Sequence, residues 1–102
     1  MKTISIVTPC YNEQENVEEL YRQVRGVMAG MGNYAYEHIF IDNSSLDETV
    51  PILRRLAAAD KNVKIIINAR NFGNIRSPMH ALLQARGDAV LLIVADTPRA
   101  TL

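Results

Sequence analysis

Four short apolar runs alternate with three segments in which apolar residues recur at helical spacing, and this alternation limits the fold most narrowly. The apolar runs, expected to be strands, cover residues 4–9, 36–42, 63–67 and 88–94. The helical segments follow Asn12, Asp47 and Ser77. Strands that alternate with helices form right-handed crossovers and a parallel sheet. The sequence therefore predicts an α/β fold of three layers, with a mostly parallel sheet and helices on both faces.

Local signals set the expected ends of these elements. Pro9 is expected to end the first strand, because proline cannot donate to a sheet ladder. Asn12 opens an Asn-x-x-Glu capping box and is expected to cap the first helix. Asp47 is expected to begin the second helix, and Pro51 favours a start one or two residues later. Residues 63–67 are a continuous branched run, which is typical of a strand buried on both faces.

Composition and charge exclude several classes of function. The chain has 102 residues, enough for one domain, with 11 basic and 11 acidic residues and no basic block, which argues against nucleic acid as a partner. Its longest apolar stretch, residues 89–95, is about a third of the ~20 residues that a transmembrane helix needs. Cys10 is the only cysteine, so no internal disulfide is possible and a cytoplasmic location is expected, with the thiol as a small buried group. His38 and His80 are isolated, which excludes a structural zinc site.

Polar side chains gather where the predicted strands end. In an open parallel sheet, ligands bind beyond the carboxyl ends of the strands. The side chains at these ends are Thr8, Pro9, Tyr11, Asn12, Glu13, Asp42, Asn43, Ser44, Ser45, Asn68, Arg70, Asn71 and Asp96. A nucleotide needs such a set of carboxylates, amides, hydroxyls and positive charge. The chain has no GxGxxG after the first strand and no GxxxxGK[ST], so neither a Rossmann dinucleotide site nor a P-loop is supported.

Five ordered motifs resemble a known family. They are TPCYNE (residues 8–13), FIDNSSLDET (40–49), ARNFGN (69–74), ALLQARGDAV (81–90) and VAD (94–96). Together they resemble the start of family 2 glycosyltransferases of the GT-A type, most of all the dolichol-phosphate mannosyltransferase and bactoprenol glucosyltransferase branch. Those enzymes move a sugar from a nucleotide onto polyprenyl phosphate. The resemblance implies that residues 1–96 are the donor-binding half of such a transferase.

The resemblance also implies roles for individual residues. It assigns nucleotide-sugar binding to Pro9, Tyr11, Asn12, Glu13, Asp42, Asn43, Ser44, Arg70 and Asp96, with Arg70 as a diphosphate contact. Asp96 matches the last aspartate of the family's Asp-x-Asp motif, and Val94 stands where the first would be. This implies a weak, substrate-dependent Mg²⁺ or Mn²⁺ site at Asp96. No catalytic residue is assigned, because the base and the acceptor site belong to sequence that is absent here.

The last six residues depart from the family pattern. Residues 97–102 read TPRATL, where members of the family usually continue with Leu-Gln-x-Pro-Pro. We expect a truncation, a frameshift or an artificial chain end, and therefore a chain that is inactive alone. The full-length protein is expected at the cytoplasmic face of a membrane. A sheet cut after its fourth strand has an open edge, so we also expect a homo-oligomer.

Structural alternatives accompany these assignments. Asp42 can order the turn after its strand, and Glu13 can interact favourably with the dipole of the first helix. Arg70 can pair with a surface carboxylate. Asp47 and Thr49 are expected to cap a helix rather than bind a ligand. The alternative function is a non-catalytic nucleotide-binding or assembly module. A phosphoacceptor receiver domain is excluded, because the chain lacks an acidic pair after the first strand and a lysine at the end of a fifth.

Overall fold

Six elements follow one another in the part of the chain that the computed structural model describes, residues 2–68 and 87–94. They are β1 (Lys2–Cys10), α1 (Val17–Ala29), β2 (Tyr34–Asn43), α2 (Thr49–Ala59), β3 (Val63–Asn68) and β4 (Ala89–Leu92). The predicted third helix, Arg70 and Asp96 lie outside the described residues. Neither described helix is long and apolar enough to cross a membrane.

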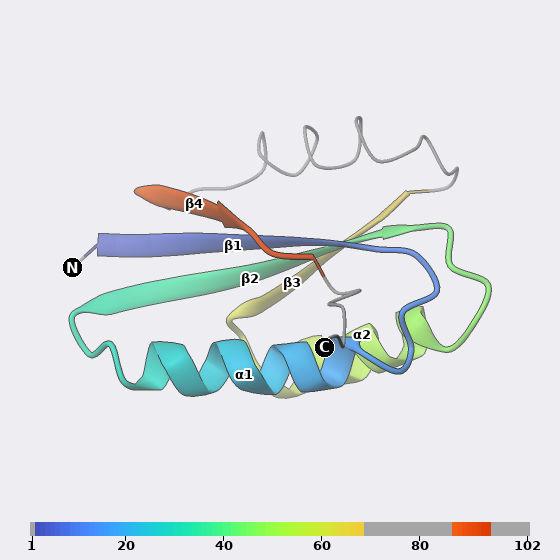
Figure 1. The fold of residues 1–102 in the computed structure, drawn as a ribbon, viewed down its shortest axis with the longest axis horizontal. Helices are drawn as coiled ribbons and strands as arrows, with labels where there is room; N and C mark the ends of the chain where they lie inside the picture. Colours follow the sequence, from blue (N-terminus) through green and yellow to red (C-terminus); the bar gives the residue numbers. More distant parts are fainter. Residues whose placement is uncertain (1, 69–86, 95–102) are drawn as a thin grey trace, which may run out of the picture.

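The strands form one sheet in the order β3-β2-β1-β4, and every pair of neighbours is parallel. In the central register, Val7 lies between Ile39 on β2 and Leu92 on β4. Helices α1 and α2 lie side by side below the sheet in Figure 1 and pack on one of its faces. The predicted parallel α/β fold is confirmed, and the helix predicted for the other face lies outside the described residues.

Helix α1 packs on the sheet through a single apolar stripe. Its buried side chains recur at helical spacing, and they are Val17, Tyr21, Val24 and Met28. They join two apolar clusters between helices and sheet, one containing Phe40 and Leu53, the other containing Ile6. Burial of each such side chain stabilises the fold by about 1.5–3 kcal/mol, so this stripe holds α1 in place.

The first helix begins later than the sequence predicts. Asn16 occupies the N-cap position and α1 starts at Val17, so the prediction that Asn12 caps this helix is wrong. Asn12 has a φ of 54°, in the left-handed region, and its side-chain oxygen accepts a hydrogen bond from the N–H of Leu46 instead. A contact between distant loops therefore takes the group that local sequence assigns to a cap.

The first strand continues through its proline. Pro9 lies opposite Ile41 and β1 ends at Cys10, so the prediction that Pro9 ends the strand is wrong. Pairing of β1 with β4 stops at Val7, so in the described part of the chain β1 has a partner on one flank only at Pro9. A residue without an N–H is tolerated at such a position.

Helix α2 begins at Thr49, so a start at Asp47 is wrong and the later start favoured by Pro51 is confirmed. Pro51 is the third helical residue, where the backbone N–H of a helix has no partner within the helix. The first helical hydrogen bond runs from the N–H of Ile52 to the carbonyl of Glu48. The proline therefore removes no bond from the helix.

Strand β3 is more exposed than its apolar sequence predicts. Lys64 is exposed and Ile67 is 43% exposed, so burial on both faces is wrong. The reason is topological, because β3 is the outer strand beyond β2 in the described sheet. The ammonium of Lys64 lies 2.7 Å from the buried carboxylate of Glu37, whose other oxygen accepts a hydrogen bond from Ser5.

The start of β4 is fastened to β1 by an unusually close backbone approach. Asp88 donates its N–H to the carbonyl of Thr3 at 2.7 Å, and its side chain accepts the N–H of Thr3 at 2.8 Å. The N–H of Gly87 donates to Ser5 Oγ at 2.8 Å. A Cβ on Gly87 would lie 2.5 Å from Ser5 Oγ and 2.9 Å from the Thr3 carbonyl oxygen, so this position requires glycine.

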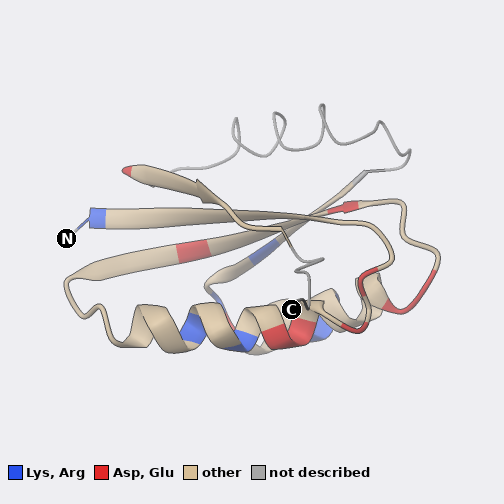
Figure 2. Ribbon diagram, in the orientation of Figure 1, with Lys and Arg blue, Asp and Glu red and all other residues tan. Residues whose placement is uncertain are grey.

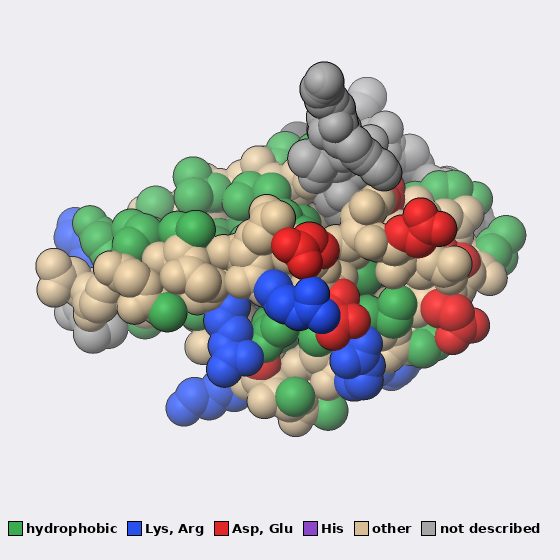
Figure 3. All heavy atoms as spheres, turned by 60° about the horizontal axis from the view of Figure 1, so that its bottom comes forward, with side chains coloured by type: hydrophobic (Ala, Val, Ile, Leu, Met, Phe, Trp, Pro, Cys, Tyr) green, Lys and Arg blue, Asp and Glu red, His purple; other side chains and the backbone are tan. Residues whose placement is uncertain are grey.

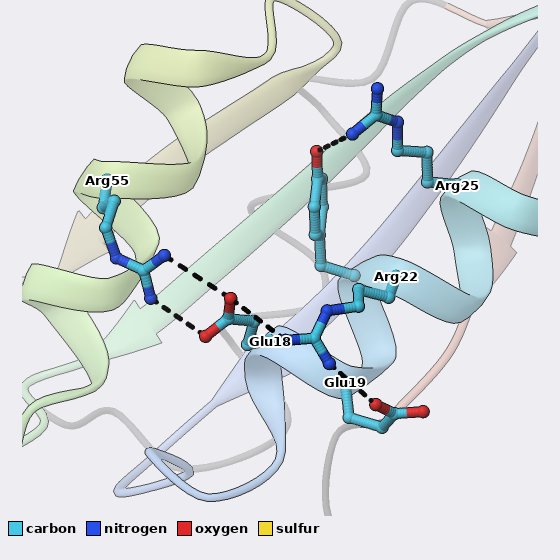
Figure 4. Close-up of polar contacts among 6 residues, drawn as sticks. Glu18, Glu19, Arg22, Arg25 and Arg55 are labelled. Atoms are coloured by element: carbon cyan, nitrogen blue, oxygen red, sulfur yellow. Dashed lines mark hydrogen bonds and ion pairs between the residues drawn. The ribbon is translucent and has the colours of Figure 1, made fainter.

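Ion pairs link the outer surfaces of the two helices. Glu18 of α1 pairs with Arg55 of α2 at 2.9 Å and with Arg22 at 3.4 Å, and Arg22 also pairs with Glu19 at 3.1 Å (Figure 4). On this face of the molecule, basic and acidic side chains lie intermixed (Figure 3). Exposed pairs of this kind contribute about 0.2–1 kcal/mol each, so packing and not charge fixes the helices.

Candidate functional site

The loops after β1 and β2 leave the sheet at the same edge. Cys10 and Asp42 are partners in the register, and Asn43 and Asn68 are partners one strand further along. Residues 11–16 and 44–48 therefore lie next to each other beyond the strands; we call these two loops, together with the strand ends 9–10 and 42–43 that lead into them, the carboxyl-end edge. Acidic residues gather there, at the right of Figure 2.

A serine hydroxyl connects the two loops. Ser45 donates its hydroxyl hydrogen bond to Asp42 Oδ1 and its backbone N–H to Asp42 Oδ2, the second at 2.9 Å. The same Ser45 oxygen accepts the N–H of Asn12 at 2.9 Å. Leu46 donates its N–H to Asn12 Oδ1 at 2.8 Å. Both oxygens of Asp42 are thereby fixed, and the backbone of the first loop is attached to the second.

A threonine hydroxyl makes a parallel connection nearer the helices. Thr49 Oγ1 accepts the N–H of Glu13 at 2.8 Å and donates to Asp47 Oδ1 at 2.6 Å. Asp47 also accepts the N–H of Thr49 at 2.9 Å and, through its other oxygen, the N–H of Gln14 at 3.2 Å. Asp47 thus accepts the N–H of the first residue of α2, although Glu48 holds the N-cap position, and the Thr49 hydroxyl binds the other loop and does not cap the helix.

These hydrogen bonds also set the charge of Asp47. Desolvation alone would raise the pKa of its carboxyl group, but the bonds from the Thr49 hydroxyl and from the N–H groups of Thr49 and Gln14 outweigh it and hold the pKa below its usual value. Asp47 is therefore charged across the physiological range. Its negative charge stands near the N-terminus of α2, where the helix dipole favours it.

Two residues at this edge have left-handed backbone conformations. Asn12 has a φ of 54° and Ser44 a φ of 62°, and no other residue except glycine has a positive φ in residues 2–68 and 87–94. Asn adopts the left-handed region more readily than most residues, and the same conformation is sterically less favourable for Ser than for Asn. Such conformations persist only where surrounding contacts hold them, and they cluster at functional sites.

The structure brings together the predicted site residues that it describes. At the end of β1 and in the first loop, Tyr11 is 45% exposed, Asn12 is exposed, and Pro9 and Glu13 are half-buried. At the end of β2 and in the second loop, Asp42 and Asn43 are buried and Ser44 is half-buried. The exposed groups of the site are therefore those of the first loop, and Asp42 orders the turn after β2, as its structural alternative predicts.

Gln14 and Ser45 are the functional candidates that sequence reasoning left out of the binding set. Gln14 Oε1 accepts the N–H of Glu48 at 2.9 Å, and Ser45 connects Asp42 to Asn12. The spacing of Ser45, three residues after Asp42, is typical of a turn in which a side-chain carboxylate accepts a backbone N–H. The contact with Asn12 has no such local signal, since it spans 33 residues of sequence.

Two titratable groups beneath the edge are buried and are not exposed to a ligand. Burial lowers the pKa of His38 to about 4, its Nε2 lies 2.9 Å from Thr8 Oγ1, and its ring stacks on Phe40. Burial raises the pKa of the Cys10 thiol far above its usual value, and the nearby charge of Asp42 raises it further. Both confirm the packing roles predicted for these residues.

The described part of the edge has negative charge and no positive charge. Its acidic residues are Glu13, Glu15, Asp42, Asp47 and Glu48, and no Lys or Arg occurs in residues 9–21 or 39–53. Among residues 2–68 and 87–94, no three His, Cys, Asp or Glu side chains are grouped so that they could hold a metal ion. The described residues alone therefore provide neither a metal site nor a cationic phosphate site.

Comparison with known proteins identifies the family. The model of "Glycosyl transferase family 2" matches residues 5–97. An undecaprenyl-phosphate 4-deoxy-4-formamido-L-arabinose transferase of Pseudomonas fluorescens is 39% identical over 91% of this chain and 27% of its own length. An uncharacterized glycosyltransferase of Bacillus subtilis, YkcC, is 37% identical over 90% of this chain and 28% of its own length. The chain thus spans less than a third of the length of these relatives.

Solved structures agree with the sequence comparison. S. aureus TarS in complex with UDP-GlcNAc superposes with a TM-score of 0.76 at 25% identity, over 94% of this chain and 27% of that one. The mannosyltransferase PcManGT from Pyrobaculum calidifontis, in complex with GDP-Man and Mn²⁺, has a TM-score of 0.69 at 22% identity, over 91% of this chain and 27% of that one. The second likeness concerns the fold alone. With its fold, its ordered motifs and this match over most of its length, the chain belongs to glycosyl transferase family 2.

Proposed function

We propose that this chain is the donor-binding part of a transferase that takes a sugar from a UDP- or GDP-sugar. In the full-length protein the acceptor is a polyprenyl phosphate, and the reaction takes place at the cytoplasmic face of a membrane. The observation that carries the proposal is the carboxyl-end edge, where Tyr11, Asn12 and Glu13 stand beside Asp42 in a chain of this family. The name of the Pseudomonas relative, which contains undecaprenyl phosphate, supports the acceptor class.

The proposed donor site places the nucleoside on the exposed loop after β1. The ring of Tyr11 is 45% exposed and can stack on a base or ribose, while Asn12 and Glu13 offer amide and carboxylate groups for hydroxyls and base edges. Pro9 shapes the loop. Asp42 and Asn43, buried at the end of β2, and Ser44, half-buried in the second loop, form the underside of the proposed site.

The diphosphate of the donor requires positive charge that the described edge lacks. Every charged side chain in residues 9–21 and 39–53 is acidic, so a diphosphate bound there would be repelled unless cations intervene. We assign this role to Arg70 and to a Mg²⁺ or Mn²⁺ ion held by Asp96 together with the diphosphate. The metal would be bound weakly in the absence of donor.

Calorimetric titration with UDP and GDP, each with and without Mn²⁺, tests the proposal. We expect one nucleotide to bind, Mn²⁺ to strengthen binding, and Tyr11→Ala to weaken it about tenfold, which corresponds to ~1.4 kcal/mol. Tyr34→Ala is the matched control, because Tyr34 is 40% exposed at the opposite end of β2. A folded chain that binds neither nucleotide, or equal affinities for the two variants, would contradict the proposal.

A non-catalytic binding module is the second candidate, and one observation favours it. Val94 stands where the family has the first aspartate of its metal motif, and this apolar side chain is 49% exposed. Asp96→Ala separates the two functions. The transferase predicts that Mn²⁺ no longer strengthens nucleotide binding in this variant. A module without catalysis predicts that the variant binds the nucleotide as tightly as the unmodified chain does, both with Mn²⁺ and without it.

A further inference from the structure

The proposed donor site contains one side chain that touches both of its loops at their functional residues. Ser45 donates to the Asp42 carboxylate through its hydroxyl and its N–H, and its oxygen accepts the N–H of Asn12 at 2.9 Å. We infer that Ser45 is a positioning residue of the nucleotide site, and this inference rests on the proposed function. Its hydroxyl holds the loop that presents Tyr11 and Asn12 in the binding conformation before the ligand arrives.

The chemistry of a hydroxyl suits this position. A serine oxygen has one hydrogen to donate and lone pairs to accept, so it can join an acceptor to a donor. Asp42 offers only acceptors when charged and the backbone of Asn12 offers a donor, so Ser45 satisfies both. Asp42 is fully buried at the end of a central strand, which makes it a fixed anchor for the more exposed residues Ser45 and Asn12.

The backbone of Asn12 needs such support. Its φ of 54° lies in the left-handed region, and two contacts hold it from opposite ends of the residue. Ser45 accepts its N–H, and the N–H of Leu46 donates to its side-chain oxygen. Removal of the Ser45 hydroxyl leaves one of these contacts, so the loop samples other conformations and only a fraction of molecules is ready to bind.

Because the loop is exposed, Ser45→Ala should lower the affinity for the nucleotide more than the free energy of unfolding. Asn12 is exposed, so water can replace the lost partner of its N–H in a Ser45→Ala variant. The apolar clusters of the described core contain neither residue. The variant should therefore fold and lose binding, which distinguishes a positioning residue from one that only supports the core.

Titration of UDP or GDP, whichever binds the unmodified chain, into three variants tests the inference. Ser45→Ala should weaken binding about five- to tenfold, and Ser45→Thr, which keeps the hydroxyl, should restore it to within about twofold. Tyr34→Ala is the control, since Tyr34 is 40% exposed at the opposite end of β2 and makes no contact with either loop in the site described above. Its affinity should remain unchanged.

A double variant tests whether Ser45 acts through Asp42. If Ser45 positions the site through this carboxylate, Ser45→Ala should weaken binding less in an Asp42→Asn background than in the unmodified chain. Additive losses, unchanged affinity of Ser45→Ala, or no rescue by Ser45→Thr would each overturn the inference and leave the proposed function intact. A Ser45→Ala chain without its circular dichroism signal would overturn it too. If the unmodified chain binds neither nucleotide, the proposed function itself fails.

Discussion

At the scale of single residues, the buried polar groups of β1 and β2 limit what the sheet tolerates. Thr8, His38 and Asp42 are fully buried on strands that carry the core, and each has a hydrogen bond to a neighbouring side chain. Among the described residues, His38 Nδ1 is the buried side-chain polar atom that has no partner. A proton on this ring would place a charge in a buried site beside Phe40, and the charge of Asp60 only partly offsets the cost of burial, so protonation of His38 destabilises the fold.

The free energy of unfolding should therefore decrease as the pH is lowered, because of His38. Burial lowers its pKa from 6.5 to about 4. Between pH 6.5 and pH 4, the unfolded chain therefore binds a proton at this residue and the folded chain does not. The contribution is fully present above pH 6.5 and is lost as pH falls towards 4. We expect the free energy of unfolding to be about 2 kcal/mol lower at pH 5 than at pH 7 from this residue.

Urea denaturation at pH 7 and pH 5 measures this effect. His38→Gln is the informative variant, because glutamine can still bond to Thr8 and does not titrate in this range. The variant should lose most of the pH dependence between the two values. The depressed pKa of Asp47 acts at lower pH, below the usual value of 3.8 for an aspartate, and so does not interfere. An equal pH dependence in both chains would contradict the prediction.

At the scale of the elements, contacts between distant segments decide where helices and strands begin and end. Helix α1 starts at Val17 because Asn12 is engaged with the loop after β2. Strand β4 is placed by the close approach of Gly87 and Asp88 to β1, more than 80 residues away in sequence. Gly87 and Asp88 therefore fix the register of β4 against β1 and also lead into the strand.

Substitution of Gly87 tests whether its close approach to β1 places β4. In Gly87→Ala the new Cβ would meet Ser5 and the Thr3 backbone at 2.5–2.9 Å, so β4 must move away from β1. We expect a loss of about 1–3 kcal/mol in the free energy of unfolding, measured by urea denaturation. Gly26→Ala is the matched control: nothing lies within 4 Å of its Cβ inside α1, and better helix propensity should stabilise that chain by up to about 1 kcal/mol. Equal effects of the two variants would count against a close approach at Gly87.

At the scale of the whole molecule, the described sheet ends in an apolar outer strand. On and just after β4, the side chains of Val90, Leu91, Leu92 and Val94 are 40–55% exposed. Beside it lies a hollow of about 300 Å³ between β4 and α1, lined mainly by apolar side chains that include Ile4, Val27, Met31, Leu91 and Ile93. An exposed apolar edge strand favours pairing with another chain.

We therefore predict that the chain self-associates through β4. Sedimentation velocity should show species larger than a monomer, and Leu92→Lys should increase the monomer fraction, because a charge on an outer strand opposes edge pairing. Leu46→Lys is the control, since its side chain is 86% exposed in the loop after β2, a strand that does not neighbour β4 in the sheet. A clean monomer at high concentration, or the same shift in both variants, would refute edge pairing.

The sequence by itself determined the elements, their order and the edge at which the site lies. Apolar periodicity is a local property, so the stripe of α1 and the strand runs are visible without the fold. Parallel crossovers then place all strand ends on one side, so Tyr11 and Asp42 had to come close together.

Only the tertiary structure decided how the site is held. The left-handed conformation of Asn12, the bridging hydroxyl of Ser45 and the shared threonine of the second connection depend on hydrogen bonds between residues 33 to 36 apart. The exposure of β3 follows from its place at the outside of the described sheet. Such features depend on which distant segments pack together, and a local sequence pattern does not predict this. Where a side chain can serve either its own helix or a distant loop, as Asn12 can, the sum of contacts in the folded chain settles the outcome.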